Sequence, residues 1–419
     1  MCLTWRQLRE MKPFRDRSTP KRVWDFVVIG AGVIGVSIAR ELKRRHGGHV
    51  LVIEKEDSAG RHASGRNSGV LHTGVYYTAG SLKARLCVEG NRRMREYCRA
   101  NRVPMVDKGK VIVTRHEGEL PALRELHKRS QANGVRVSLI DEQALRELEP
   151  CARTVGQALY VQDTAVVNPQ KVMEAMVAEA VREGVEFQYN CAWRSAGGDG
   201  AVETSQGWIA YGHLVNCAGL FADRVAHAYG VGQQYRILPF RGQFYLLRPQ
   251  SRVRVNGNIY PVPDLRNPFL GVHFTRRPEG EVTVGPSALP LLGREQYRGL
   301  RGANVSDSAA MVRYLGRLFG RNLDHFRSLA WKELAKMSRR GFYREAGGLA
   351  EGLELRDLLP GKEPGIRAQL VNTDTAELLN DFVMEHGPQS THVLNAVSPA
   401  FTSSLPFADY VVSAMKLDH

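Results

Sequence analysis

The 419-residue sequence has few cysteines and no long apolar run. Its six cysteines are scattered, with no CxxC pair and no regular spacing, which argues against a disulfide-rich secreted scaffold and against a cysteine-based zinc site. The longest apolar stretch, 26–39, is too short to span a bilayer. Residues 1–24 are basic and lack the apolar segment of a signal peptide. These absences predict reduced thiols in a cytoplasmic protein.

The charge of the chain is strongly positive, with 58 Lys and Arg against 43 Asp and Glu. A net charge of +15 favours an anionic partner, which can be nucleic acid, an anionic membrane surface or a small anionic substrate. The basic residues are dispersed, with no run of six or more, and this argues against nucleic acid. An Arg-rich composition without functional meaning is an equally good explanation. Residues 1–21 are predicted to form a poorly ordered basic arm.

One stretch near the N-terminus carries a dinucleotide-binding fingerprint. An apolar run of strand length, Val23–Ile29, leads directly into Gly30-Ala-Gly32-Val-Ile-Gly35. A segment with helical periodicity follows, and a second apolar run over 50–53 ends at Glu54. The order of strand, glycine turn, helix, strand and acid is the context that gives a G-x-G-x-x-G pattern its meaning. In this context the turn and the helix N-terminus accept a pyrophosphate, and the acid accepts from ribose hydroxyls.

A polar, glycine-rich loop over 58–69 follows the fingerprint, and its small residues and side-chain donors suit contact with a cofactor. Its segment Gly65-Arg-Asn-Ser68-Gly69 is not the G-x-S-x-G of a nucleophile elbow, because the serine is one position late. Ser68 is therefore interpreted as a cofactor contact. The sequence also has no HExxH motif and no clustered Cys/His spacing, so no metal site is predicted.

The remaining chain alternates between helical and strand patterns. Helices are predicted over 82–99, 117–132, 141–149, 169–182, from 221, over 306–345, and from Ser403 or Ser404. Strands are predicted over 109–114, 185–193, 213–218, 366–370, 382–384 and 393–395. Between 235 and 286 the pattern changes to strands at 243–247, 258–262, 271–275 and 281–284, which predicts an antiparallel sheet. Strands that resume after long insertions indicate that the dinucleotide domain is discontinuous.

Several blocks, taken in order, resemble a known family. They are HASGRNSGVLHTGVYY at 62–77, NCAGLFAD at 216–223, PFRGQF at 239–244, PFLGVHFT at 268–275 and NAVSPAFTSS at 395–404. Together they are similar to the L-2-hydroxyglutarate dehydrogenases/oxidases, FAD-dependent oxidoreductases related to D-amino-acid oxidase. The resemblance covers residues 23 to 415. The chain departs from the family in the substrate region, where Gly285-Pro-Ser287-Ala stands in place of a GPNA-like block.

The resemblance implies an α/β fold with a discontinuous, Rossmann-like FAD-binding domain and a substrate domain built on a mainly antiparallel β-sheet. The expected FAD-binding domain comprises 22–105, 160–234 and 365–419, and the expected substrate or cap domain comprises 106–159 and 235–364. The cofactor contacts are expected at Gly30, Ala31, Gly32, Val33, Ile34, Gly35, Glu54, Lys55, His62, Ser64, Arg66, Asn67, Ser68, Gly69, Val70, Ala218, Gly219, Ser398, Ala400 and Thr402.

The resemblance further implies oxidation of L-2-hydroxyglutarate to 2-oxoglutarate, with electrons passed to a quinone-linked acceptor or to dioxygen. A membrane quinone would place the protein peripherally at the cytoplasmic face of the inner membrane. No second G-x-G-x-x-G follows the first, which argues against a nicotinamide site beside the flavin. The alternatives are a related flavoenzyme acting on glycerol 3-phosphate or an amino acid and, remotely, a nucleic-acid-binding flavoprotein.

The substrate end of the site rests on arginine and histidine. A dicarboxylic 2-hydroxy acid needs cationic clamps, best supplied by the guanidinium fork, and Arg367 is preferred over Arg241 for this task. The hydroxyl proton needs a base, for which His273 is preferred over His72. Weaker candidates for the distal carboxylate are Tyr76, Tyr260 and Lys336. The competing interpretation is that the arginines form salt bridges and that the histidines and tyrosines are structural.

Overall fold

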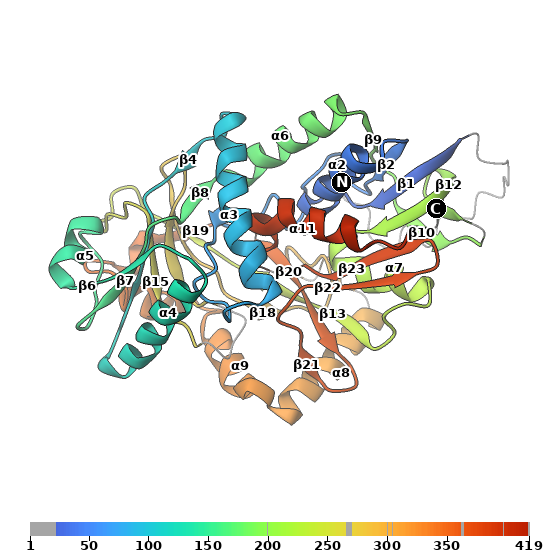
Figure 1. Cartoon of the computed structure of the whole chain (residues 1–419). Coiled ribbons are helices and arrows are strands. Elements are labelled where there is room, and N and C mark those ends of the chain that lie inside the picture. The colour runs from blue at the N-terminus through green and yellow to red at the C-terminus, as the bar shows by residue number, and fades with distance from the viewer. Residues whose placement is uncertain are drawn as a thin grey trace.

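Two large β-sheets lie at opposite ends of the molecule, and helices α3 (Leu82–Ala100) and α11 (Ala400–Ala414) cross in front of the region between them (Figure 1). This computed structural model describes residues 22–198, 200–264, 270–299, 301–303, 305–361, 364–396 and 398–417. The predicted basic arm, 1–21, lies outside the described residues. Several segments that are distant in the sequence share each sheet, so the architecture is a mixed α/β one.

The first sheet has the strand order β10-β11-β12-β1-β2-β9, with β23 and then β22 attached beside β12. Its strands are β1 (Val23–Ile29), β2 (Val50–Ile53), β9 (Val185–Gln188), β10 (Trp193–Ala196), β11 (Ala201–Thr204), β12 (Gly207–Asn216), β22 (Val383–Gly387) and β23 (Ser390–Asn395). The strands β9, β2, β1, β12 and β23 run parallel to their neighbours along this row. Residues 26–29 of β1 and all of β2 are buried on both faces, which explains why these segments are continuously apolar.

Helices cover one face of this sheet. Helix α2 (Val33–His46), helix α6 (Pro169–Arg182), α3 and α11 pack there around Val28 and Val52. The alternate residues Val27 and Ile53 point to the other face, toward α7 (Ala222–Ala228), which follows the 3-10 turn η2 (Gly219–Phe221). Helix α6 begins as the sequence predicts, because the side chain of Asn168 accepts from the backbone N–H groups of 170 and 171.

The second sheet has the order β19-β14-β17-β16-β15-β5-β7-β6, and every pair is antiparallel except β15 with β5. Its strands are β5 (Lys110–Val113), β6 (Val137–Ile140), β7 (Ala158–Val161), β14 (Tyr245–Leu247), β15 (Asn258–Pro261), β16 (His273–Arg276), β17 (Val282–Gly285) and β19 (Leu358–Pro360). The elements packed around it are η1 (Glu117–Glu119), α4 (Leu120–Ala132), α5 (Glu142–Leu148), α10 (Arg339–Gly347) and η4 (Leu355–Asp357).

Two smaller sheets join the large ones. The first has the order β18-β13-β20-β21 and comprises β13 (Tyr235–Gly242), β18 (Leu289–Pro290), β20 (Gly365–Asn372) and β21 (Glu377–Leu378). Helices α8 (Val305–Arg321) and α9 (Phe326–Ala335), joined by η3 (Leu323–His325), pack against it. The second comprises β3 (Val70–Leu71), β4 (Met105–Val106) and β8 (Ala165–Val167). These small sheets place the loop after the fingerprint next to β20.

The structure corrects the predicted elements in three places. Strand β13 was not predicted, although it pairs with β20 along its whole length. The strand predicted over 185–193 ends at Gln188, and Trp193 begins the next strand, β10. The prediction that 306–345 is helical is confirmed, and the region comprises α8, η3, α9 and α10. The last helix begins at Ala400, directly after Pro399, and not at Ser403 or Ser404. Its first turn therefore includes Thr402, which changes what that residue can contact.

Within the described residues, no helix combines the length and the apolar composition needed to cross a membrane. The five cysteines that lie in this part of the chain are all unpaired, as the scattered spacing predicts: Cys87, Cys98, Cys151, Cys191 and Cys217.

Candidate active site

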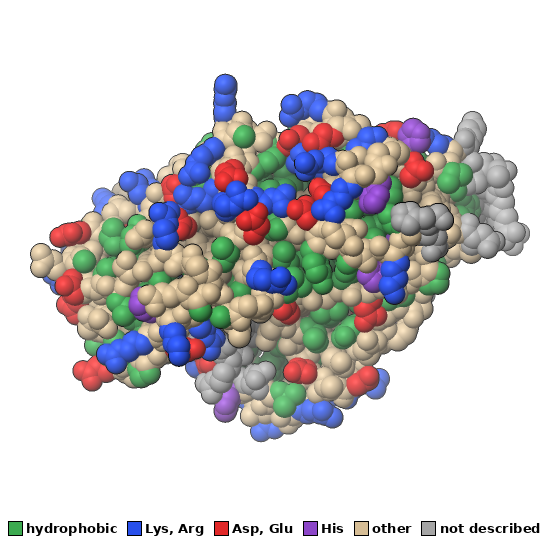
Figure 2. Space-filling model, in the orientation of Figure 1, with side chains coloured by type: hydrophobic (Ala, Val, Ile, Leu, Met, Phe, Trp, Pro, Cys, Tyr) green, Lys and Arg blue, Asp and Glu red, His purple; other side chains and the backbone are tan. Residues whose placement is uncertain are grey.

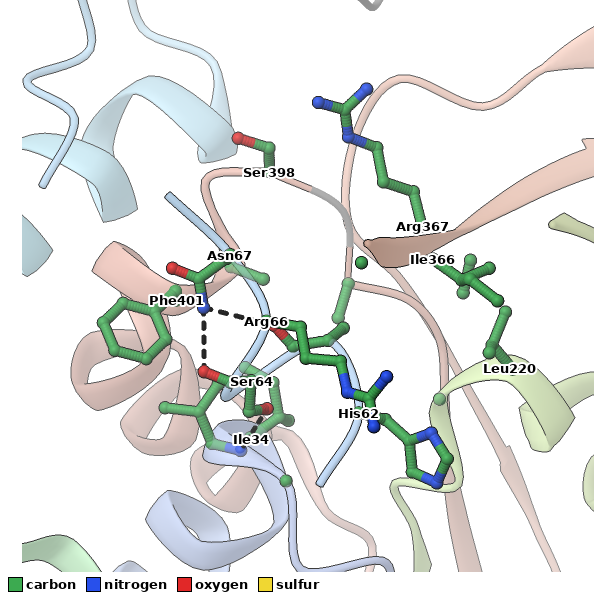
Figure 3. Close-up of a pocket in the computed structure, with 18 of the residues that line it drawn as sticks. Ile34, His62, Ser64, Arg66, Asn67, Leu220, Ile366, Arg367, Ser398 and Phe401 are labelled. Carbon is green, nitrogen blue, oxygen red and sulfur yellow. Dashed lines mark hydrogen bonds between the residues drawn. The ribbon is translucent and has the colours of Figure 1, made fainter. Parts of the chain in front are cut away.

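A cavity of about 380 Å³ runs from the glycine turn after β1 to the strands β16 and β20. Its wall combines the end of β2, the 58–69 loop, η2, β15, β16, β20 and the start of α11. Figure 3 shows Ser64, Arg66 and Asn67 on one side of the cavity and Arg367 on the strand opposite. The first sheet thus forms one end of the cavity and the second sheet forms the other.

The glycine turn has the geometry that the fingerprint requires. Gly30 has φ +100°, a conformation that side chains strongly disfavour, and a Cβ there would lie 2.6 Å from the backbone oxygen of Cys217. A Cβ on Gly35 would lie 2.0 Å from the oxygen of Gly30, so only glycine lets α2 approach the turn. Helix α2 has no acidic residue in its first turn and no side-chain cap from Gly32, which leaves its N-terminus positive. This end of the cavity can bind a phosphate.

Glu54 lies at the end of β2 and lines the cavity, as predicted. Its Oε2 accepts from the backbone N–H of Ala31 at 2.8 Å, and its Oε1 accepts from the N–H of Glu56 at 3.0 Å. The carboxylate therefore fixes the glycine turn to the sheet. Each carboxylate oxygen has a further lone pair, so the side chain can still accept from a ribose hydroxyl.

The 58–69 loop is held in place by its own polar side chains. Ser64 Oγ accepts from the N–H of Val33 at 2.9 Å, which ties the loop to the start of α2. Asn67 Nδ2 donates to the carbonyl of Ser64 at 2.8 Å, and its Oδ1 accepts from the N–H of Gly69 at 2.8 Å. A Cβ on Gly365 would lie 2.5 Å from the backbone oxygen of Arg66, so the start of β20 packs directly on this loop.

Lys55 and His62 belong to an ion-pair network at the nucleotide end. His62 Nε2 lies 2.9 Å from Oε1 of Glu56, and Lys55 Nζ lies 2.7 Å from Oε1 of Glu295. The hydrogen bond from His62 and the charge of Lys55 hold the pKa of Glu56 well below its usual range. His62, Glu56 and Glu295 have ligand-type atoms within 4.8 Å of one another. The ammonium of Lys55 already supplies the positive charge of this group.

Most of the residues predicted to contact the cofactor line the cavity. They are Gly30, Gly32, Val33, Ile34, Gly35, Glu54, Lys55, His62, Ser64, Arg66, Asn67, Ser68, Val70, Ala218, Gly219, Ser398, Ala400 and Thr402. Ala31 and Gly69 do not line it, although both donate backbone hydrogen bonds that shape the wall. The glycine turn, the free helix N-terminus and the acid at the end of β2 fit the dinucleotide part of FAD.

Arg367 lies on β20 and extends into the substrate end of the cavity (Figure 3). Burial lowers the pKa of its guanidinium, and the carboxylate of Glu333 partly offsets that shift. The group remains cationic, because arginine does not lose its proton in proteins. Arg241 lies on the neighbouring β13 opposite Ile366 and does not line the cavity. Its position gives no support to a role as the clamp.

His273 lies on β16 and lines the cavity with its ring stacked on Tyr260 of β15, at 3.8 Å between ring centroids. Its Nδ1 lies 2.9 Å from the carbonyl of Gly271, which can only accept, so Nδ1 carries the hydrogen. Burial holds the pKa of His273 well below its usual range. The ring is therefore neutral at pH 7, with a lone pair on Nε2. This is the state that a general base requires.

His72 follows β3, and its backbone N–H donates to Thr402 Oγ1 at 3.1 Å. Its Nδ1 has no hydrogen-bond partner among the described residues. Burial lowers the pKa of His72 to about 3, and three nearby cations add to this shift. The cations come from three different elements: Lys110 on β5, Lys83 on α3 and Arg367 on β20. This end of the cavity is therefore buried and positive, which suits an anionic substrate.

The three weaker candidates for binding the distal carboxylate differ in their positions. Tyr260 lines the cavity, whereas Tyr76 and Lys336 do not. Tyr76 packs in the core beside Lys110, whose Nζ lies 4.4 Å from the centre of its ring. Lys336 is buried, and its Nζ donates to Glu333 Oε1 at 2.7 Å. The ion pair with Glu333 accounts for Lys336 without a substrate.

The structure also places in or behind the cavity wall some residues that the sequence patterns did not single out. Glu333 on α9 and Lys83 on α3 line the cavity, and Lys110 lies behind Tyr260. Glu333 carries no recognisable signal, because a single glutamate in a helix is usually exposed to solvent. Lys110 does carry such a signal, because it is a charged residue in β5, whose four residues are all buried.

Comparisons with known proteins identify the family. The family model described as FAD dependent oxidoreductase matches residues 25–383. The L-2-hydroxyglutarate dehydrogenase of Salmonella houtenae is 37% identical over 400 residues, which cover 94% of this chain and 93% of that protein. The mitochondrial L-2-hydroxyglutarate dehydrogenase of Homo sapiens is 32% identical over 428 residues, covering 96% and 90% of the two chains.

Solved structures agree on the fold. The FAD-bound L-alpha-glycerophosphate oxidase of Mycoplasma pneumoniae superimposes with a TM-score of 0.73 at 21% identity, covering 94% of this chain and 96% of that one. The glycine oxidase of Geobacillus kaustophilus gives 0.68 at 17% identity, covering 93% of each chain. The α/β fold and the resemblance noted in the sequence are thereby confirmed. The chain belongs to the FAD-dependent oxidoreductase family and, within it, to the L-2-hydroxyglutarate dehydrogenases.

Proposed function

We propose that this protein oxidises L-2-hydroxyglutarate to 2-oxoglutarate with FAD as its cofactor. The observation that carries the proposal is the pairing of Arg367 with a neutral, stacked His273 at the far end of a cavity that begins at the dinucleotide turn. The names of the relatives agree with it. A small anionic 2-hydroxy acid is the substrate class that this combination of charge and base suits.

The chain's own residues then have separate tasks. The Arg367 fork binds the carboxylate next to C2, and His273 Nε2 accepts the proton of the C2 hydroxyl. The C2–H bond breaks with its electron pair as the C=O bond forms. Bound FAD supplies a hydride acceptor that an external oxidant can restore. Stacking on Tyr260 and the hydrogen bond to the carbonyl of Gly271 orient the histidine ring.

We also propose the division of labour expected from the sequence, in which 22–105, 160–234 and 365–419 hold FAD and 106–159 and 235–364 hold the substrate. Sheet membership supports it, because β1, β2, β9, β12 and β23 share one sheet while β5, β7, β15 and β16 share the other. One feature crosses the division. The β13–β20 ladder joins the two parts over eight residue pairs, from Tyr235↔Asn372 to Gly242↔Gly365.

Anaerobic addition of L-2-hydroxyglutarate to the purified holoprotein is expected to bleach the visible flavin band within one turnover, because the hydride has no other acceptor. Absorbance spectra before and after addition are the measurement. Glycerol 3-phosphate, glycine and D-alanine serve as the comparison panel. Bleaching by one of these, with L-2-hydroxyglutarate inactive, would contradict the substrate. Salt-sensitive RNA binding without any bleaching would favour a nucleic-acid-binding flavoprotein.

For the electron acceptor we propose a membrane quinone, reached at an anionic bilayer through the outer side of α8 and α9. Large apolar side chains are exposed there, with Val305 at 88%, Trp331 at 65% and Met337 at 63% exposure. We call this the α8–α9 surface, and its members are Val305, Val312, Phe319, Leu323, Trp331, Leu334 and Met337. Exposed basic side chains flank it: Arg313, Arg321, Arg327, Lys332, Arg339 and Arg340.

The position and the charge of this surface support the proposal. At the lower end of the molecule, where α8 and α9 lie, hydrophobic and basic side chains are exposed, with some acidic ones among them (Figures 1 and 2). Interfacial segments typically combine tryptophan and aliphatic side chains with lysine and arginine, which attract anionic lipid headgroups. Glu333, on the buried side of α9, lines the cavity. One helix therefore connects the cavity wall with the proposed lipid contact.

Vesicle binding tests this surface. The holoprotein is expected to sediment with phosphatidylglycerol-containing vesicles and not with vesicles of pure phosphatidylcholine. The double variant Trp331→Ser/Leu334→Ser is expected to bind at least about tenfold more weakly, because it removes apolar side chains that would be buried in the bilayer. Val181→Ser, which changes an exposed apolar residue on α6, is the matched control. Unchanged binding of the double variant would contradict the proposal. A wild-type dimer that the double variant dissociates, without vesicle binding, would assign the surface to a second copy.

A further inference from the structure

Lys110 is a buried amine for which the described residues provide no counter-charge. It opens β5 with 1% of its surface exposed, and its Nζ has no hydrogen-bond partner among the described residues. A buried ammonium without partners is costly, so such a group is either neutral or awaits an anion. The group lies one layer behind the cavity wall, with Nζ 5.0 Å from the ring centre of Tyr260, which lines the cavity.

The groups that face Lys110 come from several elements, and within the part of the chain that the structure describes none of them is an anion at pH 7. Burial raises the pKa of the Cys87 thiol on α3 to about 12, so the thiol is neutral. Burial also raises the pKa of Tyr76 and of Tyr260 above the usual tyrosine value. The other titratable neighbours are neutral or cationic: His72 after β3, His273 on β16, Lys83 on α3 and Arg367 on β20.

We propose that Lys110 is the buried cation that selects a dianionic substrate, with the second carboxylate of the dicarboxylate supplying the counter-charge that the described residues do not provide. The inference deepens the proposed function, on which it rests, by naming what distinguishes a dicarboxylate from a monocarboxylate in this cavity. Arg367 binds the carboxylate next to the reacting carbon, and Lys110 attracts the distal one past the rings of Tyr76 and Tyr260. Lys110 is therefore a positioning residue.

Binding and protonation are coupled at this site. Burial lowers the pKa of Lys110 to about 7 in the free protein. A dianion nearby stabilises the ammonium form and raises that pKa, so the complex binds more protons than the free protein does. Dicarboxylate binding therefore takes up a proton near pH 7, and the affinity falls as the pH rises above 7. A monocarboxylate held only by Arg367 has a much smaller effect.

Calorimetric titration of the holoprotein with glutarate, in two buffers of different ionisation enthalpy, measures this coupling. Glutarate carries both carboxylates but has no hydroxyl to oxidise. We expect an uptake of roughly 0.5 proton per glutarate at pH 7, rising at pH 8, because about half of the lysine is neutral when the pH equals its pKa. Lys83, whose pKa burial lowers to about 8, is already mostly charged at pH 7, and its variant Lys83→Met is expected to keep most of the uptake.

The variants Lys110→Met and Lys110→Arg complete the test. Lys110→Met is expected to abolish the proton uptake and to weaken glutarate binding by about 100-fold, as loss of one member of a buried charge pair does, while butyrate binding changes less than about threefold. Lys110→Arg keeps a permanent charge, so it is expected to keep glutarate affinity without proton uptake. Lys108→Met, an exposed lysine two residues away, is the matched control.

Several outcomes would overturn the inference. One is the absence of proton uptake by the wild-type protein at both pH values, which needs no variant and so does not depend on whether Lys110→Met folds. Another is an equal loss of glutarate and butyrate affinity in Lys110→Met. The proposed function fails separately, if L-2-hydroxyglutarate leaves the flavin oxidised, because glutarate binding requires no turnover.

Discussion

Replacing Arg367 by lysine is expected to leave FAD bound and to raise KM for L-2-hydroxyglutarate by about 100-fold, as loss of a desolvated, bidentate carboxylate contact does. Lysine keeps the charge but presents a single ammonium in place of the planar fork. Arg367 lies on β20 within the cavity wall, and its backbone is held by the ladder to β13, so the shorter side chain cannot shift its strand to compensate. Steady-state kinetics and the flavin spectrum of the variant are the measurements.

Arg241→Lys is the comparison that separates the two arginine candidates. The two residues lie on neighbouring strands of one sheet, but only Arg367 lines the cavity. The effect at Arg241 is therefore expected to be the smaller one. A KM that stays unchanged in Arg367→Lys, or a larger rise in Arg241→Lys, would move the clamp to Arg241. Loss of FAD from Arg367→Lys would show that Arg367 has a structural role and is not the substrate clamp.

The nucleotide end of the site was predictable because its physics is local. The turn at Gly30 and Gly35, the helix that follows and the acid at Glu54 all lie within one βαβ unit, where spacing alone fixes the geometry. The loop residues Ser64 and Asn67 bond to groups at most about thirty residues away. Short-range constraints of this kind leave a readable pattern in a single sequence.

The substrate end was predictable only in part, because distant segments build it. Strand β13 carries no alternation that marks it as a strand, and its stability comes from pairing with β20, more than a hundred residues later. Glu333 lines the cavity from α9, and nothing in the sequence of that helix indicates that this glutamate belongs to a site. Lys110 was visible as a charge in an apolar strand, but its neighbours come from α3, β15 and the loop after β3. No spacing rule brings such groups together.

His273→Ala is expected to lower kcat by roughly 10²- to 10⁴-fold, the usual contribution of a positioned general base, while FAD stays bound and KM changes little. His72→Ala is expected to cost less, because no hydrogen bond to Nδ1 from the described residues orients the His72 ring, whereas the carbonyl of Gly271 and the ring of Tyr260 orient His273. Stopped-flow rates of anaerobic flavin reduction isolate this step from product release. Near-normal reduction in His273→Ala would remove the histidine from the chemistry.

The pH profile supplies a second and independent check on His273. A base must be unprotonated to act, so its contribution rises as the pH passes upward through its pKa. Burial holds the pKa of His273 well below 6.5, so the acid limb of the profile lies below that pH. At saturating substrate, where the charge of Lys110 no longer limits binding, the rate of flavin reduction is expected to be flat from about pH 6 to 7. An acid limb centred near pH 6.5 would show an exposed, ordinary histidine. Partial rescue of His273→Ala by added imidazole would place the missing base in the cavity itself, since a histidine that only supports the fold is not replaced by a diffusible ring.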